Sequence, residues 1–415
     1  MEGGLAAELK ERGIIAEAGG GTLEEILASP RKVYLGIDPT SDSLHVGHLV
    51  PLLLMKDLAE AGHEIFFIVG GGTGMIGDPR ESGERGLLDK KTVASNTKKL
   101  RAQLSKIFGK KKYTILDNGA WLLKLGLVEF LRDIGKHFTV NQLIKRDIIK
   151  RRLADESDSI SFTEFSYSLL QAYDYLTLYK KYGVNLQIGG SDQWTNIISG
   201  VDLIRRKEAA SVYALTTPII EDKKSGKKFG KSEGNAIWLD PKKTSAYEFY
   251  QFWLSVSDEG VAEYLKAFTF LSLKEIADLS AKQSGAPHLR SAQKKLAYEV
   301  TKTIHGVGAA DISARISEIL FGGASLSDLS KDDIKLLHQE LKPTITPLNT
   351  AVIDVLVANG MVESKSEARR LVEARGVYLN DTPVDSPDRL FAASDFQNGL
   401  ARLRRGKTMT LLARA

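Results

Sequence analysis

The chain has 415 residues, of which 43% are hydrophobic and 26% charged, and its formal net charge is +5. These values are ordinary for a globular protein of two or three domains, and they permit a nucleic-acid partner without requiring one. The absence of cysteine excludes disulfides, thiolate catalysis and sulfur-ligated metals. The polar N-terminus lacks a secretory signal, and no apolar stretch reaches membrane-spanning length, so we expect a cytoplasmic protein with no membrane partner.

The first half of the chain alternates predicted helices and strands. Two short amphipathic helices in 4–29 precede a buried strand at 33–37, and turn residues then lead into a helix from Leu49 to Leu58. Further strands are predicted at 64–69, 113–116 and 185–188. This alternation predicts an α/β fold with a Rossmann-like parallel sheet, in which a ligand would bind at the carboxyl ends of the strands.

The rest of the chain predicts further parts. Amphipathic helices in 119–165 interrupt the alternation, and their apolar faces would form either a homodimer contact or ordinary intramolecular core. The expected organisation is a catalytic domain at 1–224 with this helical insertion, a loop and linker at 225–244, an all-α domain at 245–320, a linker at 321–348, and a small α+β domain at 349–415.

A strand that runs into a helix N-terminus forms an anion site, because the backbone N–H groups there lack intrahelical partners. His45 and His48 stand at the first such junction, three residues apart, so both side chains can lie over one bound anion. Gly47 would let a flat ligand lie against the backbone. The alternatives are a solvated helix start and a zinc pair, but no cluster of further ligands is visible for zinc.

Two glycine-rich stretches resemble other nucleotide-binding motifs without their context. Residues 72–77 form a G-x-G-x-x-G after a strand, which would indicate a nicotinamide oxidoreductase, but Asp78-Pro79 follows where a helix should run. Residues 226–232 are one residue too short for a P-loop. We interpret them as a loop, either an ordinary charged surface loop or one that carries Lys228 and Lys231 toward a polyphosphate.

A polar stripe lies on the helix predicted after Ser161. Tyr167, Gln171 and Asp174 fall at positions i, i+4 and i+7, flanked by apolar residues. Buried polar groups need partners, and a substrate with an ammonium and a hydroxyl group would supply them. The alternative is that the stripe faces water.

Two short motifs carry a family resemblance. His45-Val-Gly-His48 resembles the HIGH signature of class I aminoacyl-tRNA synthetases, and Lys228-Phe-Gly-Lys-Ser232 resembles the KMSKS signature that pairs with it. The helix with the polar stripe is similar to the tyrosine-pocket helix of bacterial tyrosyl-tRNA synthetases, and the likeness extends over nearly the whole chain. Further matching segments are Gly-Ile-Asp-Pro-Thr, Ile-Gly-Asp-Pro and Gly-Gly-Ser-Asp-Gln-Trp. The resemblance implies that the helical domain and an S-four-like C-terminal domain bind RNA.

The resemblance also implies roles for individual residues. For tyrosine it implies Tyr34 and Asp174 at the phenol, Asp78, Tyr167 and Gln171 at the ammonium, and Gln187 at the edge. For ATP and the adenylate it implies Gly36, Asp38, Thr40, His45, Gly47, His48, Asp192, Gln193 and Lys231. The catalytic set is His45, His48, Arg85, Lys228, Lys231 and Ser232, of which the last three would hold the leaving pyrophosphate.

The sequence departs from the family pattern at two places. Many relatives carry a lysine in the loop after Gly-Asp-Pro, and the corresponding loop here, 80–85, is one residue shorter and offers Arg80 instead. Pro51 stands where some relatives have a threonine near the ribose.

The implied function is tyrosine–tRNA ligase. ATP would be a substrate with Mg²⁺ on its phosphates and no protein-ligated metal, and the other partners would be L-tyrosine, tRNA-Tyr and a second copy of the chain. The candidates for tRNA contact are Arg205, Arg206 and the run from Lys145 to Arg152, including Lys150 and Arg151, at the acceptor end, and Lys365, Arg369 and Arg370 in the C-terminal domain.

Three other functions stay open from the sequence. A tryptophanyl relative would share both signatures, although Tyr34 with Asp174 favours a phenol over an indole. A catalytically inactive RNA-binding regulator would keep the fold, but intact signatures argue against it. The nicotinamide oxidoreductase is the third.

Overall fold

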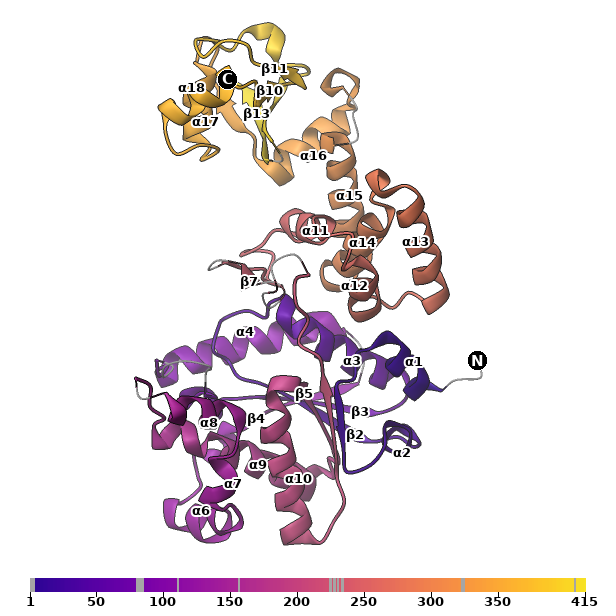
Figure 1. Ribbon diagram of the computed structural model, residues 1–415, viewed down its shortest axis with the longest axis vertical. Helices are drawn as coiled ribbons and strands as arrows, with labels where there is room; N and C mark the ends of the chain where they lie inside the picture. The colour runs from indigo at the N-terminus through magenta and orange to yellow at the C-terminus, as the bar shows by residue number, and fades with distance from the viewer. Residues whose placement is uncertain are drawn as a thin grey trace. The chain divides into compact units, whose positions relative to one another are not determined.

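The computed structural model describes residues 4–79, 86–109, 112–155, 157–223, 226, 229, 231–232, 235–321, 325–406 and 408–415. For Asp147, Lys231, Ser232 and Asn235 the backbone alone is described. The chain forms two compact units, Met1–Gly306 and Val307–Ala415 (Figure 1). In the described residues no helix is long and apolar enough to cross a membrane.

A six-stranded sheet organises the first unit, with the strand order β1-β6-β5-β2-β3-β4. The strands are β1 (Glu17–Gly19), β2 (Lys32–Ile37), β3 (Glu64–Val69), β4 (Tyr113–Asp117), β5 (Leu186–Gly190) and β6 (Tyr213–Thr217). All neighbours pair in parallel except β1, which runs antiparallel to β6. The predicted parallel α/β sheet is therefore confirmed, and its strand order reverses between β2 and β5.

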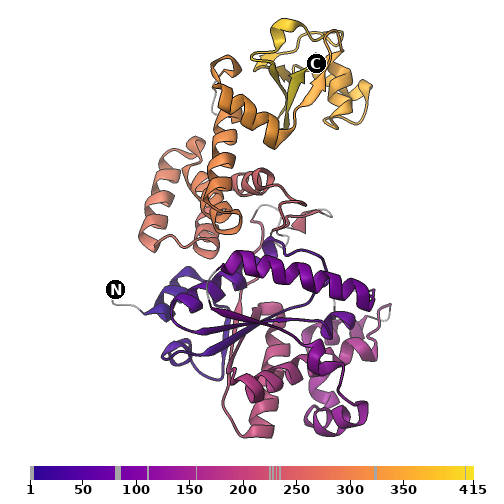
Figure 2. The ribbon, with the colours of Figure 1, turned by 180° about the vertical axis from the view of Figure 1, so that it is seen from behind.

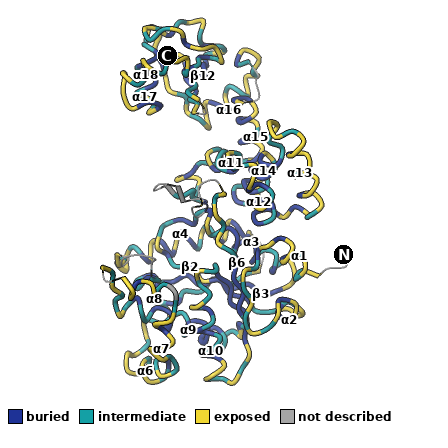
Figure 3. Tube along the Cα trace, in the orientation of Figure 1, coloured by how far each residue is buried: buried dark blue, intermediate teal, exposed yellow. Residues whose placement is uncertain are grey.

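Helices cover both faces of this sheet (Figures 1 and 2). On one face lie α3 (Leu49–Glu60) and α4 (Lys90–Phe108), and on the other α9 (Phe162–Tyr182) and α10 (Trp194–Glu208). Figure 3 shows the sheet as a buried layer between them. Helix α9 is well delimited, because Ser161 and Glu164 form a capping box at its start and Gly183 ends it with a φ of 71°.

The insertion after β4 is helical, as its pattern indicated. It comprises α5 (Gly119–Leu122), α6 (Leu127–Asp133), α7 (Val140–Leu143) and α8 (Asp147–Ala154). Several apolar side chains here and at the start of α9 are exposed in the single chain, namely Leu127, Val128, Val140 and Phe162, at 62–77%.

The first unit also holds α11 (Ala246–Leu254), α12 (Val261–Phe268), α13 (Leu273–Gly285) and α14 (Ser291–His305), which pack around buried aromatic rings. Helix α1 (Leu5–Arg12) ties them to the rest of the unit, because the buried Arg12 guanidinium donates to the backbone carbonyls of Lys266, Thr269 and Leu271. The short helix α2 (Leu23–Leu27) lies beside α1.

The second unit begins with α15 (Val307–Phe321) and α16 (Lys331–Leu341). A small α+β domain follows them. Helix α15 thus belongs to this unit, although the sequence grouped it with the helical domain at 245–320.

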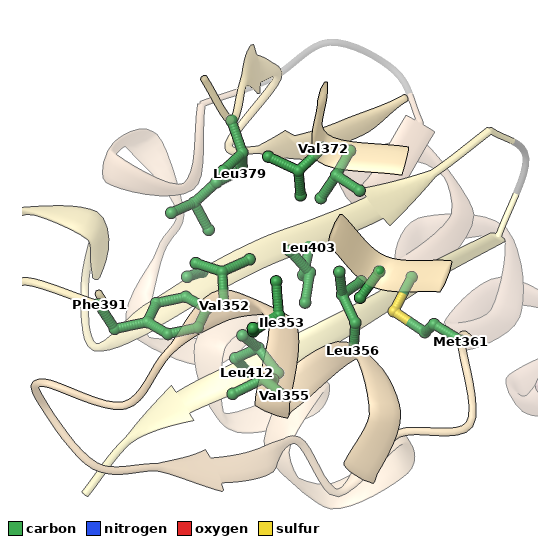
Figure 4. Packing of buried hydrophobic residues seen from close by; sticks show 14 of the residues in the cluster. Val352, Ile353, Val355, Leu356, Met361, Val372, Leu379, Phe391, Leu403 and Leu412 are labelled. Carbon is green, nitrogen blue, oxygen red and sulfur yellow. The ribbon is translucent and has the colours of Figure 1, made fainter. Parts of the chain in front are cut away.

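Helices α17 (Val352–Ala358) and α18 (Lys365–Glu373) pack on a sheet ordered β11-β10-β12-β13-β9. Leu356, Phe391, Leu403 and Leu412 lie in its core (Figure 4). The sheet comprises β9 (Thr344–Thr346), β10 (Val377–Leu379), β11 (Thr382–Pro383), β12 (Leu400–Arg405) and β13 (Thr408–Arg414).

Candidate active site

A cavity of about 750 Å³ opens at the carboxyl ends of β2 and β5, where the strand order reverses. It is lined by all fourteen residues that the sequence assigned to tyrosine or ATP and whose side chains or glycine backbones the structure describes. These are Tyr34, Gly36, Asp38, Thr40, His45, Gly47, His48, Asp78, Tyr167, Gln171, Asp174, Gln187, Asp192 and Gln193. Strands β2 and β5 and helix α9 supply six of them, and the other eight lie in the segments that follow β2, β3 and β5.

The two histidines lie together at one end of the cavity, with ring centroids 4.0 Å apart. The His45 Nδ1 accepts a hydrogen bond of 3.0 Å from the Gly47 amide, so the neutral imidazole carries its proton on Nε2 and can donate it to an anion. A Cβ at position 47 would lie 2.8 Å from the His45 ring, so glycine is needed for this fold-back. Residues Val46–His48 form a 3₁₀ turn directly ahead of α3.

The opposite, deep end of the cavity holds a carboxylate fixed by two side-chain donors. Asp174 accepts 2.7 Å and 2.8 Å hydrogen bonds from Trp121 Nε1 and Asn118 Nδ2, and burial raises its pKa to about 7. Tyr34 Oη and Gln187 Oε1 are also buried, and neither has a hydrogen-bond partner in the described part of the chain. A ligand hydroxyl between these groups would satisfy them.

Asn118 and Trp121 escaped the sequence analysis. Trp121 was read as part of an apolar insertion, and nothing near it in the sequence points to Asp174. Asn118 directly follows β4, and a polar residue after a parallel strand is a signal that could have found it.

Two further carboxylates, Asp78 and Asp38, line the same cavity. Asp78 accepts from Gln193 at 2.6 Å and from Asn196 at 3.1 Å, and burial raises its pKa to about 6. Asp38 accepts from the Tyr167 hydroxyl at 2.7 Å and from Thr73 at 2.6 Å. Gln193 and Asp38, both assigned to ATP from the sequence, therefore hold polar groups on the tyrosine side as well.

The signature loop is described in part. Lys228 and Arg85, like Arg80, lie outside the described residues, and the side chains of Lys231 and Ser232 do too. The backbone places Lys231–Ser232 in β7, which pairs with β8 (Asn235–Ala236). A P-loop would begin a helix here, so its rejection is confirmed.

The G-x-G-x-x-G stretch likewise contains only a 3₁₀ turn, Thr73–Met75, and no α-helix lies between it and α4 in the described residues.

Phe229 anchors the middle of the signature loop. Phe229 is 5% exposed. Its ring centroid lies 4.6 Å from that of Tyr264, 5.1 Å from that of Phe252 and 5.6 Å from that of Phe268. The Tyr264 hydroxyl also bonds to the backbone of Glu221 and Lys223, where the loop begins. Helices α11 and α12 therefore hold two points of the loop.

The residues assigned to tRNA lie outside the cavity. Lys150, Arg151 and Arg205 are exposed on α8 and α10, and Lys365, Arg369 and Arg370 are exposed on α18. Lys365 and Arg369 pair with Asp354 and Asp388. Arg206, assigned with them, is partly covered and donates to the His137 carbonyl.

Arg152 does not fit the expected basic face. Its side chain is 2% exposed and pairs with Glu164 at 2.7 Å and with Asp158 at 3.1 Å. A charge run in sequence does not say which member turns inward, and α8 turns Arg152 toward the start of α9.

A parallel sheet with a histidine pair at one end of its ligand cavity and a KMSKS-like hairpin define the class, a class I tRNA synthetase catalytic domain. A family model described as tRNA synthetases class I (W and Y) matches residues 28–322, and one described as a tyrosine–tRNA ligase SYY-like C-terminal domain matches 335–413. The tyrosine–tRNA ligase of Dechloromonas aromatica is 44% identical over 412 residues, covering 97% of each chain, and that of Corynebacterium glutamicum is 44% identical over 96% of each.

The chain belongs to the tyrosine–tRNA ligase family, which confirms the resemblance inferred from the sequence. A C-terminally truncated mitochondrial tyrosyl-tRNA synthetase of Aspergillus nidulans superposes with a TM-score of 0.67 at 32% identity, covering 76% of this chain and 94% of that one. A tryptophanyl-tRNA synthetase of Encephalitozoon cuniculi shares the fold, with a TM-score of 0.54 and 16% identity over 79% of this chain and 89% of that one.

Proposed function

We propose that this protein joins L-tyrosine to tRNA-Tyr in two steps, with ATP as a substrate. First, a carboxylate oxygen of tyrosine bonds to the α-phosphorus of ATP while the bond to the β-phosphate bridging oxygen breaks, which gives tyrosyl-adenylate and pyrophosphate. Then a ribose hydroxyl of the terminal adenosine of the tRNA bonds to the tyrosyl carbonyl carbon, and AMP leaves as the hydroxyl loses its proton. The attacking carboxylate is already ionised, so positioning and electrostatics carry the first step without a general base.

The buried polar groups at the deep end of the cavity carry this proposal. Asp174 can accept a hydrogen bond from a phenol, and the Tyr34 hydroxyl can bond to the same oxygen. Phenylalanine would leave the buried Tyr34 hydroxyl without a partner and would offer Asp174 no hydrogen bond beyond those from Trp121 and Asn118. An unsatisfied polar group is costly in a buried site. The pocket therefore selects a para-hydroxyl group.

The middle of the cavity suits the ammonium and carboxylate of the amino acid. Asp78 faces the same cavity as Gln171 and Tyr167, and an ammonium group there would favour the ionised form of Asp78. The tyrosine carboxylate would then point toward the histidine end, where the α-phosphate would bind.

The histidine end suits the nucleotide. A Cβ at Gly36 would meet no atom within 4 Å, so the backbone there is open to a ligand. The Nε2–H groups of His45 and His48, with the ammonium groups of Lys228 and Lys231, would stabilise the charge that builds on the phosphates. Mg²⁺ enters with the ATP phosphates as part of the substrate.

The exposed surfaces suit the larger partners. The apolar side chains on α6, α7 and the start of α9 would be covered in a homodimer, whose mass sedimentation would measure directly. The basic residues on α8, α10 and α18 would contact the tRNA backbone, and the site of action would be the cytoplasm, where tRNA is charged.

Pyrophosphate exchange into ATP, assayed with each of the twenty amino acids in turn, tests the proposal. Exchange that depends on tyrosine and not on phenylalanine or tryptophan is expected. Exchange with tryptophan alone would indicate the tryptophanyl activity, and no exchange with any amino acid, together with tRNA binding, would indicate an RNA-binding regulator.

A further inference from the structure

The segment that follows β7 and β8, the strands of the signature loop, is hydrogen-bonded to the segment that carries His45. Immediately after β8, the carbonyl of Ile237 accepts a 2.9 Å hydrogen bond from the Val46 amide, and the Leu239 amide donates a 2.8 Å bond to the Leu44 carbonyl. Between them, His45 and Trp238 form an antiparallel bridge. The backbone thus joins the two signatures.

The Trp238 side chain lies against the His45 imidazole. The two rings meet edge to face, with centroids 6.0 Å apart and an interplanar angle of 73°. On the other side, the Lys243 ammonium lies 4.5 Å from the Trp238 ring centroid, within the range of a cation–π contact. Thr244 accepts a hydrogen bond of 3.1 Å from the Trp238 amide.

Lys243 is itself held by a carboxylate. Asp42 pairs with Lys243 and, at 2.8 Å, with Lys99 on α4, and these two cations hold the pKa of Asp42 below its usual range. Asp42, Lys243, Trp238 and His45 therefore form a continuous row from the surface to the cavity, which we name the Trp238 row.

Trp238 is not among the residues that line the cavity, so its influence on a ligand must pass through His45. The His45 ring is fixed by the Gly47 amide at Nδ1 and by Trp238 at its edge. Two fixed contacts set the direction of the Nε2–H bond, and a donor already aimed at its target needs no reorganisation when charge develops.

We propose that Trp238 is a positioning residue for His45 in adenylate formation, and that Lys243 holds Trp238 in place. The proposal rests on the proposed function, in which His45 meets the phosphates of ATP. The backbone bonds of the segment do not depend on the Trp238 side chain, so a substitution there changes the ring contact and leaves the connection between the signatures intact.

Steady-state pyrophosphate exchange tests the proposal with Trp238→Leu, Trp238→Phe and the wild type. Trp238→Leu should lower kcat by at least about tenfold, because a small misplacement of a catalytic group is costly, and leave the KM for tyrosine unchanged. Trp238→Phe keeps an aromatic edge and should restore most of the rate. Lys243→Met should lower kcat by about threefold, and its exposed neighbour control, Lys242→Met, should not.

A double-mutant cycle with His45→Ala separates positioning from a structural role. If Trp238 acts through His45, then Trp238→Leu has no further effect on kcat in the His45→Ala background. Independent, multiplicative losses would overturn the proposal, as would a Trp238→Leu enzyme with unchanged kcat or with equal losses in kcat and tyrosine affinity. If the wild type itself shows no tyrosine-dependent exchange, the proposed function fails instead.

Discussion

The two ends of the cavity are held in different ways. At the deep end, Asp174 on α9 is fixed by Asn118 and Trp121, more than fifty residues earlier in the chain, through side-chain hydrogen bonds in the core. At the other end, His45 is fixed by its own local backbone at Gly47 and by Trp238, which lies far later in the chain and pairs with it backbone to backbone. The tyrosine end of the site thus depends on side-chain hydrogen bonds in the core, and the histidine end depends on two short motifs whose backbones are joined.

Removal of a lysine from the signature loop should distinguish the functions of the two ends of the cavity most clearly. Lys231→Ala should lower pyrophosphate exchange by roughly 10²- to 10³-fold, because a fixed charge that stabilises the transition state is lost. The Kd for tyrosine, measured by equilibrium binding, should stay unchanged. Lys242→Ala is the matched control, and equal losses in exchange and tyrosine binding would contradict the role assigned to Lys231.

The deep end is tested by Asp174→Asn. The amide cannot accept from both Trp121 and Asn118, so one buried donor loses its partner at a cost of about 1–3 kcal/mol. The kcat/KM for tyrosine should fall by roughly 10- to 100-fold, and discrimination against phenylalanine should shrink. Asp202→Asn changes a carboxylate on α10 outside the cavity lining and should alter neither quantity; a similar effect of both would refute a specific role for Asp174.

The pH dependence of tyrosine binding tests Asp78. Because its pKa is raised to about 6, the free enzyme loses the carboxylate that pairs with the ammonium as the pH falls below that value. The KM for tyrosine should therefore rise by up to about tenfold per unit below about pH 6, in addition to any change near pH 7 from Asp174, whose own pKa is raised to about 7. Asp78→Asn should bind tyrosine weakly at every pH, and a constant wild-type KM down to about pH 5 would exclude this role.

The smallest effect is expected for Tyr34→Phe. The hydroxyl has no protein partner among the described residues, so its removal should not lower the free energy of unfolding. The KM for tyrosine should rise about two- to tenfold, the value of one neutral hydrogen bond. The control is Tyr175→Phe, whose hydroxyl donates to the Tyr213 carbonyl at 2.8 Å; it should lose about 1 kcal/mol of stability with unchanged selectivity. A loss of stability in Tyr34→Phe with an unchanged KM for tyrosine would exclude a contact between the Tyr34 hydroxyl and the substrate.

The same contrast explains what the sequence could predict. His45, Gly47 and His48 lie close together in the chain, so their motif and the alternating strands identified that end of the cavity, and the family pattern supplied the residues of the deep end. The partners of those residues were missed, because the pairing of Asp174 with Trp121, or of Asp78 with Asn196, leaves no local pattern. For the same reason, the parallel pairing of β9 with β13 was not foreseen, since it joins segments nearly seventy residues apart.

Burial of single charged residues was equally hard to read. Arg152 stands in a basic run that suits RNA, yet it lies inside the protein because Glu164 and Asp158 neutralise it there. Helical spacing places residues on a face, but the neighbours that cover this face come from elsewhere in the chain.

Arg12 has a practical consequence for handling this protein. Its guanidinium, at the end of α1, hydrogen-bonds to the end of α12 and the residues after it. Helix α1 therefore connects the N-terminal part of the first unit to its helical part. An affinity tag placed ahead of Leu5 should leave these hydrogen bonds intact. A shortened version that begins after Gly13 would expose three buried carbonyls and loosen the helices on which Phe229 rests.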